Sequence, residues 1–174
     1  MKDWPELLFE TLKAAGVRQV GYVPDAGHKR LIELCLADKA TRAEVLSTEA
    51  EGMGLAAGAW LGGERAALLM QSSGVGNCIN QLGTVRECRF PLLMLVTMRG
   101  QKGEFNPWQV PMGQATPAVL EAMDVVVEEA NTAEEIVPAV DAAARLAFGS
   151  YQAVAVLISQ AVIGIKSFQD QASR

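Results

Sequence analysis

The chain has 174 residues, half of them hydrophobic, which is enough to bury the core of a single domain. Its formal net charge of −5 disfavours nucleic acids and anionic membranes as partners. No hydrophobic run reaches the length of a membrane span, and the first residues lack the layout of a secretory signal, so we expect a cytoplasmic protein.

The three cysteines, Cys35, Cys78 and Cys88, lie far apart in apolar or helical stretches. This spacing argues against disulfides, and we expect reduced, buried thiols. No pair has the spacing of metal ligands, and His28 is the only histidine. We therefore expect no metal ligands in this chain.

Short apolar segments alternate with segments of helical spacing along the whole chain. In chain order we expect helix Pro5–Ala15, strand Gln19–Val23, helix Lys29–Ala37, strand Glu44–Ser47, helix Glu49–Leu61, strand Ala66–Gln71, helix Asn77–Arg89, strand Leu92–Thr97, helix Pro117–Met123, strand Val125–Glu128, helix Ala133–Ala147 and strand Ala153–Ser159. Several strands are continuously apolar, which is typical of strands covered by helices on both faces. The sequence thus predicts one α/β domain over residues 1–174: a doubly wound, mostly parallel six-stranded sheet with helices on both faces.

The chemically suggestive residues lie in the segments that follow the expected strands. In open parallel sheets, ligands bind at the carboxyl ends of the strands. The segments that leave those ends are Pro24–Arg30, Thr48–Gly52, Ser72–Asn80 and Arg99–Gln109. The last belongs to a long stretch, Arg99–Thr116, which we expect to be an irregular, functional loop. The sequence therefore predicts one composite site.

Glu49 opens a segment in which Gly or Ala fills six of the eight positions from Gly52 to Ala59. An interior glycine costs a helix roughly 0.5–1 kcal/mol relative to alanine, so we expect another group to approach this backbone closely. Thr48 and Glu51 have the spacing of a capping box, which gives Glu51 a structural role. Glu49 is then either a functional carboxylate or an acidic residue favoured by the helix dipole.

The segment Ser72–Asn77 contains two glycines between a strand and a helix, where backbone N–H groups can bind an anion. It is not a dinucleotide-binding fingerprint, because Ile79 occupies the position of the third glycine. The alternative is a tight turn in which Ser73 or Asn77 caps the following helix. Both interpretations remain open at this level.

Together these motifs resemble the pyrimidine-binding domain of thiamine-diphosphate-dependent enzymes. The resemblance extends from Trp4 to Ser159 and rests on Tyr22–Asp25, Thr48–Gly52, Ala56–Ala59, Leu69–Asn77, Pro91–Leu95 and Pro111–Pro117. Within that superfamily the sequence is most similar to the alpha subunits of sulfopyruvate decarboxylases and to the matching half of phosphonopyruvate decarboxylases.

The resemblance implies thiamine diphosphate as cofactor and assigns Glu49 to the glutamate that contacts N1′ of its aminopyrimidine. A proton shared there favours the imino form, which removes the proton from thiazolium C2 and so prepares the attack on a 2-keto acid. By the same resemblance we expect further cofactor contacts from Ser73, Gly74, Asn77 and Asn80. The candidate substrate contacts are Asp25, His28, Lys29, Arg30, Arg99, Lys102 and Gln109.

One family motif is missing. The family holds Mg²⁺ and the diphosphate with a Gly-Asp-Gly sequence and a downstream Asn, but this chain contains no Gly-Asp dipeptide. The resemblance therefore implies half an active site, without a diphosphate- or Mg²⁺-binding domain. A second subunit supplies the other half, and we expect a homodimer core within a hetero-oligomer.

The implied reaction is the decarboxylation of a small anionic 2-keto acid, 3-sulfopyruvate to sulfoacetaldehyde. The alternatives are phosphonopyruvate or another 2-keto acid as substrate, and a non-catalytic binding module of the same fold. Many family members place histidines around the substrate, but the Arg99–Thr116 stretch has none. The proton donor is then either His28 or a residue of the partner subunit.

Overall fold

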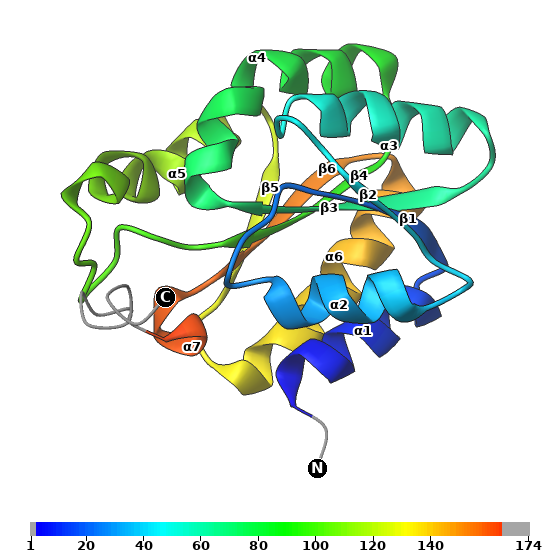
Figure 1. Ribbon diagram of the computed structural model, residues 1–174. Helices are drawn as coiled ribbons and strands as arrows, with labels where there is room; N and C mark the ends of the chain where they lie inside the picture. The colour runs from blue at the N-terminus through cyan, green and yellow to red at the C-terminus, as the bar shows by residue number, and fades with distance from the viewer. Residues whose placement is uncertain (1–2, 165–174) are drawn as a thin grey trace.

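The computed structural model describes residues 3–164, in which helices cover both faces of a six-stranded sheet (Figure 1). All neighbouring strands are parallel, in the order β2-β1-β3-β4-β6-β5. The strands are β1 (Val17–Tyr22), β2 (Arg42–Val45), β3 (Arg65–Gln71), β4 (Leu92–Thr97), β5 (Val126–Ala130) and β6 (Ala153–Ile158). This confirms the predicted fold class.

Two groups of helices pack on opposite faces of the sheet. One face carries α3 (Glu51–Leu61), α4 (Ser72–Cys88) and α5 (Val110–Ala122), and the other carries α1 (Trp4–Ala14), α2 (Lys29–Ala37) and α6 (Ala133–Ser150) (Figure 1). The short helices η1 (Pro107–Gln109) and α7 (Gln160–Ile163) lie in the segments after β4 and β6, and α7 was not predicted. The carboxyl ends of the strands lie at the left of Figure 1.

The central strand β4 explains why the sheet is apolar on both sides. All six of its residues are buried. Leu93 and Leu95 join the core under α1, α2 and α6, whereas Met94 and Val96 join the core under α3, α4 and α5. A strand that faces two cores has no polar side to show, which is why its sequence is continuously apolar.

The glycine-rich segment after β3 is helical, so our prediction of a turn or loop at Ser72–Asn77 was wrong. Helix α4 begins at Ser72, directly after the last residue of β3. The Ser72 hydroxyl is buried and accepts a hydrogen bond from the Arg99 backbone N–H at 3.0 Å. Tertiary packing of this first turn therefore outweighs the low helix propensity of Gly74 and Gly76.

The expected loop Arg99–Thr116 is also largely helical, and only its first part is irregular. Helix α5 starts at Val110, with Pro111 in its first turn, where the missing N–H of proline costs nothing. A side-chain carbon at Gly113 would collide with the Arg99 carbonyl group, so this glycine lets α5 pack against the segment after β4. Two of the residues that suggested a loop, Pro111 and Gly113, thus fit the start and the packing of a helix.

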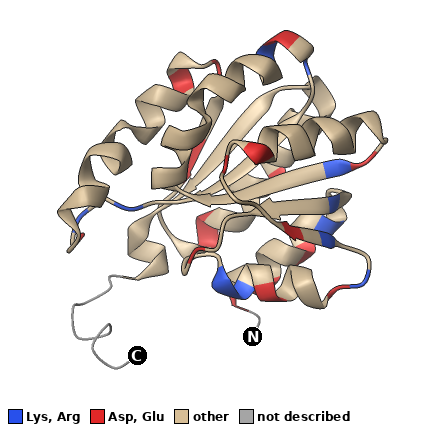
Figure 2. Ribbon diagram, turned by 45° about the horizontal axis from the view of Figure 1, so that its top comes forward, with Lys and Arg blue, Asp and Glu red and all other residues tan. Residues whose placement is uncertain are grey.

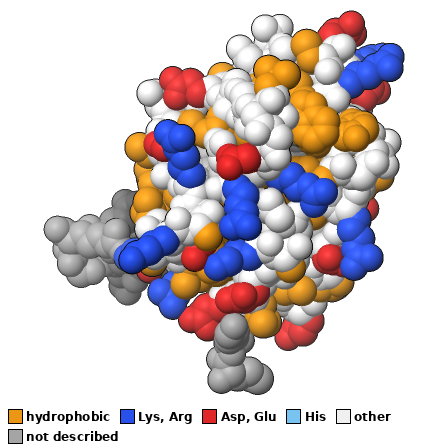
Figure 3. Space-filling view, turned by 90° about the vertical axis from the view of Figure 1, so that its right-hand side faces the viewer, with side chains coloured by type: hydrophobic (Ala, Val, Ile, Leu, Met, Phe, Trp, Pro, Cys, Tyr) orange, Lys and Arg blue, Asp and Glu red, His pale blue; other side chains and the backbone are white. Residues whose placement is uncertain are grey.

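Charged residues of both signs are interspersed along the outer helices, strand ends and loops (Figure 2). Lys and Arg side chains gather on the face at the right of Figure 1, where the strands begin (Figure 3). Arg42 and Arg65 lie at the starts of two of these strands, opposite the carboxyl edge of the sheet. The cations gathered here therefore do not belong to the predicted site.

All three cysteines are free thiols, but the prediction that they are buried was wrong for Cys88, which is exposed at the end of α4. No helix in the described part of the chain is long and apolar enough to cross a membrane.

Candidate functional site

The four segments predicted to form a site do meet at the carboxyl edge of the sheet. Asn77 of α4 reaches the segment before α3 through Glu49. Thr97 at the end of β4 reaches the segment after β1 through Asp25. The Arg99 backbone bonds the first residue of α4. Hydrogen bonds therefore join segments that are distant in sequence.

Glu49 lies in the turn between β2 and α3, and it is buried, with 7% of its surface exposed. Its Oε2 accepts a hydrogen bond from Asn77 Nδ2 at 2.9 Å. A side-chain carbon at Gly74 would overlap this carboxylate, so the glycine creates the space that Glu49 fills. Burial, and after it the charge of Glu49, raise the pKa of the Cys78 thiol to about 11. The first turns of α4 are thus built around one carboxylate.

The predicted capping box at Thr48 and Glu51 does not form. Helix α3 begins at Glu51, and Glu49 lies outside it, in a turn closed by the bonds from Glu51 N–H to the Thr48 carbonyl and from Gly52 N–H to the Glu49 carbonyl. The Glu51 carboxylate accepts instead from the Ser47 N–H at 2.8 Å. Glu51 keeps a structural role, but one residue further back than predicted.

Helix α3 meets its neighbours closely at only one of its glycines. A side-chain carbon at Gly52 would come within 2.7 Å of Leu68, as the prediction of a close approach requires. At Gly54 and Gly58 such a carbon would have no described atom within 4 Å. Leu61, on the last turn, is 87% exposed. The Gly54–Gly58 side of α3 is therefore an open surface of small residues.

Asp25, after β1, is the centre of a second polar cluster. Its carboxylate accepts hydrogen bonds from Thr97 Oγ1 at 2.5 Å, Gln71 Nε2 at 2.9 Å and the Gly27 N–H at 3.1 Å. Ser73 donates to the other end of the Gln71 amide at 2.9 Å. The predicted residues Asp25 and Ser73 thus belong to one network.

Gln71 and Thr97, which link this network, were missed by the sequence analysis. Each is the last residue of a strand whose preceding five residues are apolar. A polar residue that ends a buried strand at the carboxyl edge is the signal that could have identified both.

His28 was predicted to contact the substrate, but its side chain is completely buried. Its Nε2–H donates to the Leu95 carbonyl oxygen at 3.0 Å, while no described atom bonds Nδ1. Burial lowers the pKa of His28 from 6.5, against the opposing charge of Asp25. We conclude that His28 is a neutral core residue and that a substrate cannot reach it.

Two of the four predicted cations are held by carboxylates. Arg99 forms a nearly buried pair with Glu104, in which the side chains are 14% and 1% exposed. Two hydrogen bonds from Arg99, at 2.6 and 2.5 Å, contribute most to the lowering of the Glu104 pKa to about 2. Arg30 pairs on the surface with Glu6 at 2.9 Å and Glu33 at 3.8 Å.

The remaining predicted residues have fewer constraints. Lys29 and Lys102 are exposed, as is Asn80. Gln109 is half-buried, and its Oε1 has no hydrogen-bond partner among the described residues. No described cluster of His, Cys, Asp or Glu could hold a metal ion.

The residues around Glu49 are suited to bind a heterocyclic cofactor. The Asn77 amide occupies Oε2, while no described group donates to Oε1. A buried carboxylate with one free oxygen can accept a hydrogen bond from a protonated ring nitrogen. The exposed Asn80 side chain, one turn beyond Asn77 on α4, adds a polar group on the same helix.

The sequence matches the family model described as thiamine pyrophosphate enzyme, N-terminal TPP binding domain, over residues 3–109. It is 33% identical to sulfopyruvate decarboxylase subunit alpha of Methanothermobacter thermautotrophicus, over 90% of this chain and 95% of the relative. The same subunit of Methanococcus maripaludis is 34% identical, over 88% of this chain and 92% of the relative.

Two further proteins are similar over part of their length. Phosphonopyruvate decarboxylase of Streptomyces viridochromogenes is 36% identical over 66% of this chain, but the match spans only 29% of that protein. A solved structure of 2-oxoglutarate:ferredoxin oxidoreductase from Magnetococcus marinus superposes with a TM-score of 0.71 over 94% of this chain and 30% of that chain. At 11% identity this second likeness concerns the fold alone.

Proposed function

Because this chain belongs to the thiamine pyrophosphate enzymes, through their N-terminal TPP binding domain, we propose that it is the alpha-type subunit of a 2-keto acid decarboxylase. The substrate is 3-sulfopyruvate, as the names of the relatives with nearly full coverage suggest. The bound cofactor accepts the electron pair that decarboxylation releases. The protein must hold and tune it.

The single observation that carries this proposal is the buried Glu49 carboxylate above Gly74. Asn77 fixes one oxygen of Glu49, and the other, which has no described donor, would be free to exchange a proton with N1′ of a bound aminopyrimidine. Ser73, Gly74 and Asn80, the further cofactor contacts in this proposal, lie on the same helix as Asn77. A structural copy of the fold would have no need for a buried, unpaired carboxylate, which argues against a non-catalytic module.

Asp25 is the group we propose for the substrate side. Thr97 and Gln71 fix its carboxylate at the carboxyl edge, and their hydrogen bonds hold its orientation. Since His28 is buried, the proton donor to the reaction product comes from Asp25 or from the partner subunit.

A partner subunit completes the site in this proposal. It contributes the ligands for Mg²⁺ and the contacts to the diphosphate, because this chain lacks the Gly-Asp-Gly motif. The open Gly54–Gly58 side of α3 supports a docking surface there, since small residues allow close backbone approach. Only one charged residue, Glu51, occurs in α3, as expected for a surface that another chain covers.

The test is co-expression with a subunit that contains Gly-Asp-Gly and a downstream Asn. The purified complex is assayed with thiamine diphosphate and Mg²⁺ on sulfopyruvate, phosphonopyruvate and pyruvate. We expect the highest kcat/KM with sulfopyruvate. A preference for phosphonopyruvate would assign the alternative substrate, and inactivity with every 2-keto acid would contradict the proposal.

A further inference from the structure

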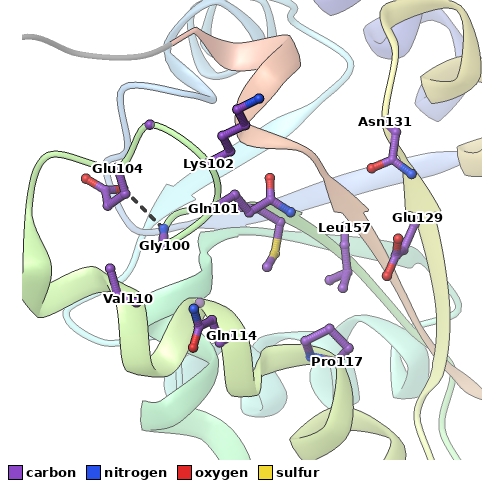
Figure 4. A pocket seen from close by; sticks show the side chains of 13 residues that line it. Gly100, Gln101, Lys102, Glu104, Val110, Gln114, Pro117, Glu129, Asn131 and Leu157 are labelled. Atoms are coloured by element: carbon purple, nitrogen blue, oxygen red, sulfur yellow. Dashed lines mark hydrogen bonds between the residues drawn. The ribbon is translucent and has the colours of Figure 1, made fainter.

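A cavity of about 530 Å³ opens at the carboxyl edge, between the segment after β4 and helix α5 (Figure 4). This volume lies within the usual range of ligand-binding sites. Apolar side chains line part of it: Met98, Val110, Pro117 and Leu157. Polar side chains surround the rest: Gln101, Lys102, Gln114 and Asn131. A small molecule with a polar end and a short carbon chain matches such a lining.

Hydrogen bonds hold the wall of the cavity. Glu104 accepts from Arg99, the Asn106 N–H and Gln160, and also from the Gly100 N–H, which Figure 4 shows. The Gln101 side-chain oxygen accepts from Ser159 at 2.9 Å and from the Gln160 N–H at 2.7 Å. Its amide N–H₂ remains available to a ligand.

Among the described residues that line this cavity, Lys102 is the cation. Arg99 and Arg30 are held in ion pairs, and Lys29 lines a different hollow, beside Ile32 and Glu33. No described carboxylate forms an ion pair with Lys102.

Two carboxylates also line the cavity. The charge of Glu104 is compensated by Arg99. Glu129 lies at the other end, beside Leu157 (Figure 4). The described cation of the lining, Lys102, is therefore not neutralised by either carboxylate.

The cavity adjoins the surroundings of Asp25. Met98 lines both the cavity and a smaller hollow that contains Asp25 and Thr97. A ligand in the cavity is therefore separated from the Asp25 cluster by little more than the Met98 residue.

We propose that Lys102 binds the terminal anion of the substrate in this cavity and thereby selects sulfonated 2-keto acids over pyruvate. The amide N–H₂ group of Gln101, the neighbour of Lys102, donates a further hydrogen bond to the anion. The identity of the substrate rests on the proposed function, whereas the anion site itself rests on the cavity.

The first test measures binding without catalysis. The full-length chain is titrated with sulfoacetate, an unreactive sulfonate, and the amide signals of Gly100, Gly103 and Gly113 are followed by NMR. Loss of a charge-assisted contact in Lys102→Met should raise Kd roughly tenfold or more, while Lys102→Arg retains binding. Lys39→Met, at an exposed lysine between α2 and β2, is the matched control and should leave Kd unchanged. If the wild type does not bind sulfoacetate, or if Lys102→Met binds equally well, the anion site is refuted.

The second test uses the complex with the partner subunit. In Lys102→Met, kcat/KM for sulfopyruvate should fall roughly tenfold or more through KM, with little change for pyruvate. Equal kinetics in wild type and variant would overturn the role of Lys102 while the decarboxylase assignment stands. Conversely, sulfoacetate binding that depends on Lys102, in a complex that decarboxylates no 2-keto acid, would retain the anion site and reject the proposed function.

Discussion

Gly74 lies directly beneath the carboxylate of Glu49, so that any side chain at residue 74 would occupy the space of that carboxylate. The two residues belong to separate segments of the chain: Glu49 precedes α3, and Gly74 lies in the first turn of α4. Asn77, one turn after Gly74, bonds the same carboxylate. The position of Glu49 is therefore set by α4 as much as by its own segment.

Gly74→Ala should displace Glu49 and remove most activity. The added methyl group cannot be accommodated without moving the carboxylate, so the rate should fall by about 10²-fold or more, as for loss of an acid–base group. Overpacking should also lower the free energy of unfolding by about 1–3 kcal/mol. Decarboxylase assays of the complex and urea unfolding of the chain measure the two effects.

Gly149→Ala is the control for this substitution, because it lies in α6 and its new methyl group meets no described atom within 4 Å. It should raise the free energy of unfolding by up to about 1 kcal/mol and leave activity unchanged. If Gly74→Ala keeps its activity as Gly149→Ala does, the close contact between Gly74 and Glu49 is not needed for catalysis.

The sheet was predictable because its strands carry their own signal. The bounds of β4 agree with the prediction, since a strand buried on both faces is apolar throughout. At the edge of the sheet, β2 is mostly exposed and carries Arg42 and Glu44, so its expected bounds were shifted by two residues. The hydrophobic pattern of the sequence predicts strand bounds least well where a strand is exposed to water.

The starts of α4 and α5 could not be predicted from local sequence. Gly74 and Gly113 weaken a helix by propensity, yet each is required where another chain segment presses against the helix. The segments that press, at Glu49 and Arg99, are distant in sequence. Without the contact, a glycine needed for packing looks the same as a glycine in a turn.

Two capping-box patterns in this chain had different outcomes. At Thr132 and Glu135 the box forms, and Glu135 accepts from the Thr132 N–H. At Thr48 and Glu51 a tight turn precedes α3, and the Glu51 carboxylate accepts from the Ser47 N–H instead of the Thr48 N–H. This same turn places Glu49 outside the helix, which the spacing alone could not reveal.

Replacing Arg99 by Met should destabilise the fold without changing substrate preference. The variant leaves Glu104 buried without its cation, and breaking such a pair typically costs about 3–5 kcal/mol. Urea unfolding measures this loss, and the remaining activity should fall equally for sulfopyruvate and pyruvate. The exposed Arg30 should tolerate the same replacement with little loss of stability. A selective loss with sulfopyruvate in Arg99→Met would instead give Arg99 the role proposed for Lys102.

The stability of the protein should decrease as the pH falls below about 6.5 because of His28. Its folded-state pKa is lowered by burial, so below 6.5 the unfolded chain binds a proton that the folded chain does not. The unfolding free energy therefore rises with pH in this window. His28→Gln, which does not titrate, should flatten the profile between pH 7.5 and 5 in urea unfolding. An unchanged slope in that variant would show that other groups cause the dependence; Glu104, with its pKa lowered to about 2, acts only at lower pH.

Glu49→Gln should fold, assemble and bind cofactor, yet lose most of its activity. Glutamine can still accept the hydrogen bond from Asn77, but it cannot exchange a proton with the aminopyrimidine. Acid–base contributions of this kind are worth about 10²–10⁴-fold in rate. Steady-state kinetics of the complex measures the loss, and calorimetric titration with thiamine diphosphate and Mg²⁺ checks that binding survives.

Glu51→Gln is the matched control, because these two glutamates differ in environment and not in chemistry. Glu51 is exposed, and among the described residues its carboxylate accepts only from the Ser47 N–H, a bond that a glutamine oxygen can also accept. Rate and stability should therefore change little. If Glu51→Gln abolishes activity while Glu49→Gln remains active, the functional carboxylate is two residues away from the one assigned. If both variants remain fully active, neither Glu49 nor Glu51 takes part in the reaction, and the role of thiamine diphosphate in this chain is refuted.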